Sequence, residues 1–252
     1  MKNIMLTTAI ILHIVVMGCS SKNEPSMNVA EPQNSTSGTG SDVLSDFLLG
    51  HQSNITSSGS NSLQTVAIHL YHPDSTTTVS GGAITVNGSL IPRWTENGTT
   101  WYQNKGGGWA GPLVLDGSFH VFNVPGGPGF PAFTDSVRSP GGATTLLYPT
   151  AADSLSRSAG ATIQWTPSGG VDGVVITIRD TSKTIGSKII SKELSGNPGS
   201  LHLSAMELSV LKPGPIMVRV YCGNSKNGVA GSGQKYRITV FSSQGVRAWL
   251  KN

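Results

Sequence analysis

The chain has 252 residues, of which only 12% are charged, and it contains 32 glycines and 14 prolines. This composition favours many short strands joined by turns over helices, which are usually rich in Glu, Lys and Ala. The formal net charge is +4, but the lysines and arginines are scattered along the chain. Because no basic cluster is present, we expect no nucleic-acid partner.

Residues 1–18 have the pattern of an export signal. Lys2 precedes an apolar run from Ile4 to Val16 that is too short to span a bilayer as a helix. The following residues, Val16-Met17-Gly18-Cys19, resemble the lipobox of bacterial lipoproteins. That resemblance implies cleavage before Cys19, lipidation of its thiol and membrane lipid as its partner. It also implies an envelope location, and it favours the outer membrane in a cell with two membranes.

Residues 19–62 are expected to form a flexible linker that begins with the lipidated Cys19. From Ser20 to Ser41 almost every residue is polar, glycine or proline, and such a segment cannot bury enough apolar surface to offset the entropy of ordering. A brief apolar group at 43–49 is compatible with a turn or two of helix docked on the domain, or with the tether.

A small N-terminal β unit is predicted over residues 63–136. Apolar residues alternate with others from Val66 to Leu70, which indicates a strand. Asn87-Gly88 lies between two short apolar runs and predicts a two-residue hairpin turn. Asp116-Gly117 predicts a second hairpin within 113–124.

Residues 137–252 are predicted to form a second, larger β unit. Its candidate strands lie near 144–148, 161–165, 173–179, 185–193, 200–204, 215–222 and 234–242. The run Ala161 to Pro167, which contains Trp165, and the turn Leu211 to Gly214 resemble parts of a fibronectin type III or Ig-like module. The resemblance implies a β-sandwich with Trp165 in its core. The fold class is therefore expected to be all-β throughout, after the signal peptide and tether.

The last predicted strand has one apolar and one polar face. Tyr236 and Ile238 alternate with Lys235 and Arg237. We interpret the two basic residues as the solvent face of this strand.

Candidate catalytic and metal-binding groups do not converge in the sequence. His69 and His72 are three residues apart, which places them on opposite faces of a strand, and the alternative is a metal site with His120 or Asp74. We interpret His120 as an outward strand residue and Cys222 as a buried thiol that acts as a small hydrophobe. No metal or cofactor is expected, and an enzyme such as an envelope hydrolase is only the third hypothesis.

The aromatic group Trp94, Trp101, Tyr102 and Trp109 lies in a stretch rich in Gly and Asn. Trp offers a broad, rigid surface on which a sugar ring can stack, so one interpretation is a glycan-binding site. The other interpretation is that these side chains form the core of a unit that is short of Leu and Ile. The sequence leaves both open.

Together these patterns predict a lipid-anchored cell-envelope protein with a non-catalytic interaction or structural role. The alternative function is glycan or cell-wall binding through the aromatic group. The expected partner is an envelope polysaccharide or another envelope protein.

Overall fold

The computed structural model describes residues 44–72, 78–96, 98–103, 109, 111, 113–166, 169–181, 188–231 and 233–252. Apart from one short helix, the regular elements within these residues are all strands, so the chain is all-β. The strands are β1 (Ser45–Thr56), β2 (Gly59–His69), β3 (Thr85–Val86), β4 (Ser89–Leu90), β5 (Arg93–Glu96), β6 (Thr99–Gln103), β7 (Phe119–Val124), β8 (Phe133–Arg138), β9 (Leu146–Tyr148), β10 (Ser154–Ser156), β11 (Ala161–Trp165), β12 (Gly173–Asp180), β13 (Ile189–Ser195), β14 (Ser200–Leu203), β15 (Gly214–Ala230) and β16 (Gln234–Lys251).

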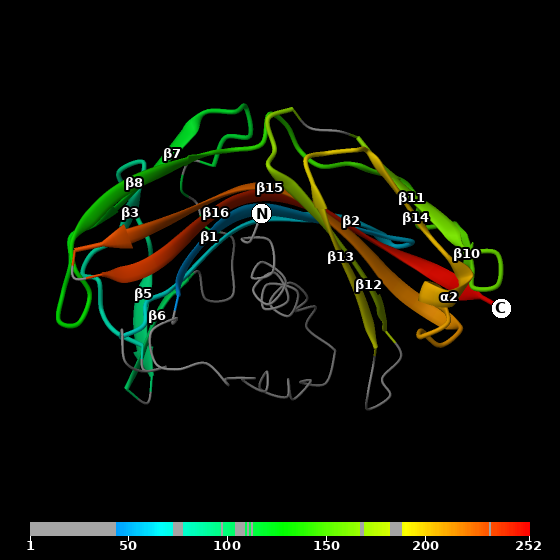
Figure 1. The fold of residues 1–252 in the computed structure, drawn as a ribbon, viewed down its shortest axis with the longest axis horizontal. Coiled ribbons are helices and arrows are strands. Elements are labelled where there is room, and N and C mark those ends of the chain that lie inside the picture. Colours follow the sequence, from blue (N-terminus) through cyan, green and yellow to red (C-terminus); the bar gives the residue numbers. More distant parts are fainter. Residues whose placement is uncertain are drawn as a thin grey trace.

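One large, curved sheet runs the length of the molecule (Figure 1). Its strand order is β13-β12-β15-β16-β1-β2-β6-β5, and β10 pairs with the far end of β16. The antiparallel pair β15 and β16, with 17 and 18 residues, forms the spine of this sheet. Beside it, β1 pairs with β16 in parallel and with β2 in antiparallel orientation.

Part of the segment that was expected to be a flexible linker is strand. Residues 19–43 lie outside the described residues, but most of 44–62 belongs to β1 and β2 and is not a tether. The apolar group at 43–49 is strand and not helix, and Phe47 and Leu49 within it are fully buried. Polar residues after Gly50 masked this strand in the sequence. These residues adopt the strand conformation because β1 forms backbone hydrogen bonds with β16 on one side and β2 on the other.

Two smaller sheets pack on the same face of the large sheet, which we call the upper face (Figure 1). One has the order β4-β3-β7-β8 and the other β14-β11-β9. The first core, between the first small sheet and the large one, includes Phe47, Val66, Ile68, Phe122 and Val124. The second core, under the other small sheet, includes Ile163, Trp165, Ile176, Val218 and Leu250. The molecule is thus two sandwiches that share one sheet.

The alternation along β16 shows that both cores lie on one face. Tyr236, Ile238 and Val240 belong to the first core, whereas Val246 and Leu250 belong to the second. All five are even-numbered, and even positions of a strand share one face. The expected division at 136/137 falls inside β8 of the first small sheet, and the last strand contributes to both cores.

In the N-terminal unit, one predicted hairpin is confirmed and the other is wrong. Asn87 and Gly88 have φ angles of 48° and 80°, and they join β3 to β4. Asp116-Gly117 does form a turn, in which Asp116 Oδ1 accepts a hydrogen bond from the Ser118 amide at 2.8 Å. However, residues 113–115 are not a strand, and β7 pairs with β3 and β8 instead.

The orientation of His120 was also predicted wrongly. His120 is only 1% exposed, while its neighbours Phe119 and Val121 are 52% and 40% exposed. The His120 ring nitrogens lie 3.0 Å from the Asn87 amide nitrogen and 3.0 Å from the Val114 carbonyl oxygen. A buried imidazole is stable here because both ring nitrogens have partners.

In the C-terminal half, the predicted strands all occur, and the structure adds β10. The last two strands are longer than predicted, because β15 and β16 continue past 222 and 242. Trp165 is 1% exposed, and its indole N–H donates to Asn197 Oδ1 at 2.7 Å. The expected core position of Trp165 is confirmed.

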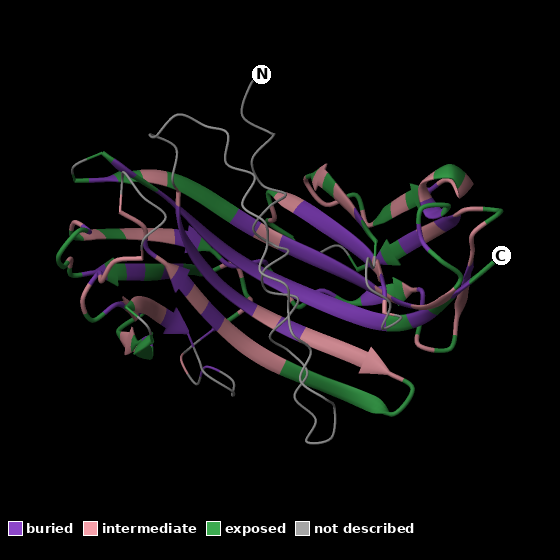
Figure 2. Cartoon of the chain, turned by 90° about the horizontal axis from the view of Figure 1, so that it is seen from below, coloured by how far each residue is buried: buried purple, intermediate pink, exposed green. Residues whose placement is uncertain are grey.

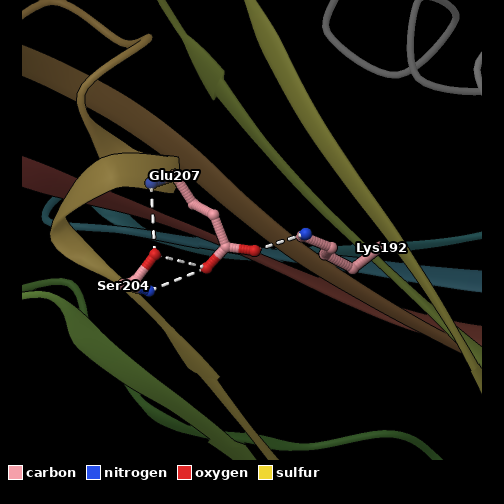
Figure 3. Close-up of polar contacts among 3 residues, drawn as sticks. All are labelled: Lys192, Ser204 and Glu207. Atoms are coloured by element: carbon pink, nitrogen blue, oxygen red, sulfur yellow. Dashed lines mark hydrogen bonds and ion pairs between the residues drawn. The ribbon is translucent and has the colours of Figure 1, made fainter.

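The helix α2 (Ala205–Leu208) connects β14 to β15 and is fixed at its start by a capping box (Figure 3). The Ser204 hydroxyl accepts from the Glu207 amide at 3.3 Å, and Glu207 Oε2 accepts from the Ser204 amide at 2.8 Å. Lys192 of β13 forms an ion pair with the same carboxylate. The contact to Lys192 and these hydrogen bonds lower the pKa of Glu207 to about 2.

Candidate functional site

The predicted aromatic group divides between the two faces of the large sheet. Tyr102 is fully buried in the first core, where its hydroxyl accepts from the Gly81 amide at 2.9 Å and donates to the Gly82 carbonyl at 3.0 Å. Trp109 is 5% exposed, and its ring lies so close to Gly111 that a Cβ there would overlap it. The core interpretation therefore holds for Tyr102 and Trp109.

Trp94 and Trp101 lie on the opposite face, which we call the lower face. They are directly opposed on β5 and β6, and their rings stack with centroids 5.6 Å apart and an interplanar angle of 18°. His69 of β2 extends this arrangement, with its ring 5.5 Å from that of Trp101 at 81°. All three side chains are partly exposed. They form an aromatic surface at the edge of the large sheet.

The strand register continues this row toward the middle of the sheet. His69 is opposite Asp46 of β1, and Asp46 is opposite Arg237 of β16. An Arg237 guanidinium nitrogen lies 3.3 Å from Asp46 Oδ1, and both residues are buried. We call Trp94, Trp101, His69, Asp46 and Arg237 the lower-face row. Neighbouring strands are about 4.8 Å apart, so the row extends over about 19 Å, from the partly exposed rings to the buried charged pair.

Burial dominates the electrostatics at Asp46. It raises the pKa of this carboxyl from 3.8 to about 6, although the charge and hydrogen bond of Arg237 act in the opposite direction. Burial and the nearby Asp46 also raise the pKa of the Tyr71 phenol. Because this pKa lies below 7, Asp46 is mostly ionised at neutral pH and forms an ion pair with Arg237.

Arg237 was expected on the solvent face of its strand, and this expectation is wrong. The apolar partners Tyr236 and Ile238 are buried in the first core as expected, and Lys235 is exposed. Arg237 is 5% exposed on the lower face. A sequence pattern gives only the face of a residue, whereas the partner Asp46 comes from a strand at the other end of the chain.

Glycines allow two large side chains to lie flat on the lower face. The Phe241 ring covers Gly50 so closely that a Cβ at Gly50 would overlap it. The guanidinium of Arg219 covers Gly245 in the same way, with a nitrogen 2.9 Å from the position of a Cβ. The Tyr221 ring lies 5.9 Å from that of Phe241. In the middle of the lower face, Tyr221 and Phe241 thus pack with Leu48 and Val175 in a small buried cluster.

The other predicted site residues do not gather into a second site. His69 and His120 belong to different sheets, and Asp74 lies outside the described residues. Within the described part of the chain, no three His, Cys, Asp or Glu side chains come together in a group that could hold a metal. Cys222 is fully buried in the second core, which confirms the expected environment of its thiol.

The membrane-related predictions concern residues outside the described part of the chain. The lipobox and Cys19 lie in residues 1–43. In the described ranges, no helix has the length and apolar character needed to cross a bilayer.

Sequence reasoning identified the two tryptophans of the lower-face row but missed the other three members as partners. His69 could have been found, because alternation with buried Val66 and Ile68 places it on the face away from the core. Asp46 could not, since it was assigned to the linker. Its pairing with Arg237 spans 191 positions of the sequence.

Comparisons with known proteins add little to this geometry. No protein-family model matches the chain, and no curated protein matches it. One solved structure, described as "Structures of Clostridium thermocellum CbhA fibronectin(III)-like modules", is similar over 79% of this chain and 89% of that chain, with 12% identity and a TM-score of 0.22. Such a low TM-score supports no argument, so the all-β assignment rests on the strands and cores described above.

Proposed function

We propose that this chain is a lipid-anchored cell-envelope protein whose β body binds a glycan without catalysing a reaction. The observation that carries the binding role is the partly exposed stack of Trp94 on Trp101, which His69 extends. Stacked aromatic rings match the apolar C–H faces of sugars, and they are rigid before the ligand arrives, so little entropy is lost on binding.

Three buried polar residues lie on the same face as the stack. Asp46 and Arg237 continue the same row, and Gln103 lies next to Trp101 on the same face with a buried side-chain oxygen that has no hydrogen-bond partner. A few convergent polar groups next to apolar surface are typical of small-molecule and sugar sites. The proposed ligand is therefore a chain of sugars that stacks on Trp94 and Trp101.

The proposed anchor rests on Val16 to Cys19. In bacterial cells, the wild-type precursor should sediment with membranes, and the Cys19→Ser precursor should become soluble. Cys222→Ala removes the other cysteine and serves as the matched control. Membrane retention of the Cys19→Ser protein would overturn the anchor.

Glycan binding is tested with the mature chain from residue 19 carrying Cys19→Ser. Affinity electrophoresis through immobilised neutral and acidic polysaccharides, and sedimentation with peptidoglycan, would reveal a ligand. We expect Trp101→Ala to weaken binding by about fivefold or more, because loss of one stacking ring removes roughly 1 to 3 kcal/mol.

The matched control is Phe119→Ala, which removes a 52% exposed ring from the outer side of the first small sheet. Circular dichroism should show that both variants remain folded. If no polysaccharide binds, or if Trp101→Ala and Phe119→Ala bind equally well, the glycan role is wrong and a structural or protein-binding role remains.

A further inference from the structure

A second row of side chains crosses the other end of the lower face. Ile189 of β13 is opposite Arg179 of β12, Arg179 is opposite Met217 of β15, and Met217 is opposite Arg247 of β16. All four positions are odd, and the even positions of β12, β15 and β16 fill the second core. We call these four residues and Trp249 the arginine row. It alternates apolar side chains with guanidinium groups.

The arginine row is accessible. Ile189 is 40% exposed and Trp249 is 51% exposed, Arg247 is also exposed, and Arg179 and Met217 are partly exposed. The row therefore presents both apolar surface and guanidinium groups to a ligand.

The positive charge of the arginine row is not balanced locally. Among the described residues, neither Arg179 nor Arg247 forms an ion pair, and the ion pairs of the described chain lie elsewhere. The nearest carboxylate in the register on this face is Glu193, four positions from Ile189 along β13, which corresponds to about 13 Å. Unbalanced guanidinium groups are suited to bind carboxylate or phosphate oxygens.

A buried hydroxyl on the same face also lacks a partner, four positions from Met217 along β15, which corresponds to about 13 Å. Tyr221 is 2% exposed on the lower face, and its hydroxyl makes no hydrogen bond. Burial raises the pKa of Tyr221 to about 12, and the charges of Arg219 and Arg179 act in the opposite direction. The Arg219 guanidinium lies 5.8 Å from the centre of the Tyr221 ring. An unsatisfied buried hydroxyl is costly, and a bound oxygen would relieve that cost.

We propose that the arginine row binds the carboxylate groups of an acidic, linear polysaccharide. This inference rests on the proposed function and narrows its ligand class. The lower face is the concave side of the arched sheet (Figure 1), and a rod-like polymer can lie in such a concavity, whereas a flat bilayer cannot follow it. Trp249 supplies a stacking ring beside the guanidinium groups, as Trp94 and Trp101 do at the other end.

The two rows lie on one continuous sheet. Arg237 and Arg247 are ten positions apart on β16, which corresponds to about 33 Å. Figure 2 looks onto this face from below and shows the long strands that connect the two ends. A polymer several sugars long can therefore contact both rows, and contact with two sites raises the overall affinity.

The test uses the mature chain carrying Cys19→Ser and two forms of one polymer. Polygalacturonate has a carboxylate on every sugar, and its fully methyl-esterified form has the same backbone without the charge. We expect tighter binding of the acidic form, weakened by added salt. Arg179→Gln/Arg247→Gln should weaken binding of the acidic form about tenfold and leave the ester unchanged, because each screened ion pair contributes modestly.

The matched control is Arg138→Gln/Lys212→Gln, which removes the same charge from exposed positions away from the lower face. It should bind like wild type, and thermal unfolding should show that both double variants are folded. Trp101→Ala should weaken binding of both polymers, which keeps the test of the proposed function separate.

Three outcomes would overturn this inference. Equal binding of both polymers, unchanged by Arg179→Gln/Arg247→Gln, would leave glycan binding in place but remove the acidic ligand. Binding to neither polymer would exclude this ligand class. Binding only to vesicles of anionic phospholipid, lost in Arg179→Gln/Arg247→Gln, would replace the polysaccharide by a membrane surface.

Discussion

The upper and lower faces of the large sheet use the same strands for different purposes. On β1, Phe47 and Leu49 point into the first core, while Asp46 between β2 and β16 forms an ion pair on the lower face. On β6, Tyr102 is buried in the core and its neighbour Trp101 is partly exposed. The two large cores therefore lie on the upper face, while the lower face carries charged and aromatic groups around a smaller buried cluster of Leu48, Val175, Tyr221 and Phe241.

The largest expected effect comes from the upper face of β1. Phe47 is fully buried, and its ring contacts Phe122, Phe133 and Tyr236 edge to face. We expect Phe47→Ala to lower the free energy of unfolding by about 3 to 5 kcal/mol, because a large cavity forms. Urea unfolding measures this loss, and exposed Phe119→Ala should cost about 0.5 kcal/mol or less. Equal effects would mean that β1 does not hold the first core.

The next effect tests the ion pair of the lower face through pH. The pKa of Asp46 is about 6 in the folded protein, against an ordinary value of 3.8 that applies to the unfolded chain. The Asp46 carboxyl therefore binds its proton more tightly in the folded protein than in the unfolded chain. The stability that this group contributes is fully present below about pH 4 and is lost as the pH rises to about 6, a change on the order of 2 to 3 kcal/mol.

The free energy of unfolding of the wild-type protein should therefore fall between about pH 4 and pH 6, and this fall should be absent in Asp46→Asn. Urea midpoints across this range, compared between wild type and variant, provide the measurement. Glu193→Gln, which changes an exposed carboxyl on the same face, is the control. Parallel curves for wild type and Asp46→Asn would contradict the raised pKa.

A smaller effect tests the packing of the Phe241 ring on Gly50 in the middle of the lower face. Gly50→Ala would place a methyl group inside the Phe241 ring, so we expect a loss of about 1 to 3 kcal/mol. Gly142→Ala places its Cβ in open space and should be neutral or slightly stabilising. The combination Gly50→Ala/Phe241→Ala should cost less than the sum of the single changes. An additive result would show that this contact is not strained.

The smallest effect compares neighbouring residues of β6. Tyr102→Phe removes a hydroxyl that bonds the backbone at Gly81 and Gly82, and it should cost about 1 to 2 kcal/mol of stability with glycan affinity unchanged. Trp101→Ala should show the reverse pattern, with weakened binding and a smaller loss of stability. If Tyr102→Phe weakened binding as strongly as Trp101→Ala, the division between the two faces would be wrong.

Local patterns predicted much of the strand content. Val66, Ile68 and Leu70 alternate and are buried, and Asn87-Gly88 forms the predicted turn because Asn and Gly accept positive φ angles. Turn residues and alternation act over a few positions, so one sequence is enough to read them. The His120 error shows the limit, since a polar residue on a short strand does not reveal which face has partners for it.

The candidate site was only half predictable. Trp94 and Trp101 were found by residue type, but the same reasoning included Tyr102 and Trp109, which the fold places in the core. Burial depends on which strand comes to lie above a side chain. The pairing of Asp46 with Arg237 and the alignment of Arg179 with Arg247 depend on strand register, which a local pattern does not contain.

The sequence by itself determined the all-β class and most of the strands and turns, and it predicts an export and lipidation signal in residues that lie outside the described part of the chain. Only the tertiary structure decided that β1 is a central strand, that β15 and β16 continue through both halves, and that the two cores share one sheet. The physical reason is the range of the interactions. Turn geometry and side-chain alternation are local, whereas sheet pairing joins residues as distant as Ser45 and Tyr236 through backbone hydrogen bonds that every residue type except proline can donate and accept.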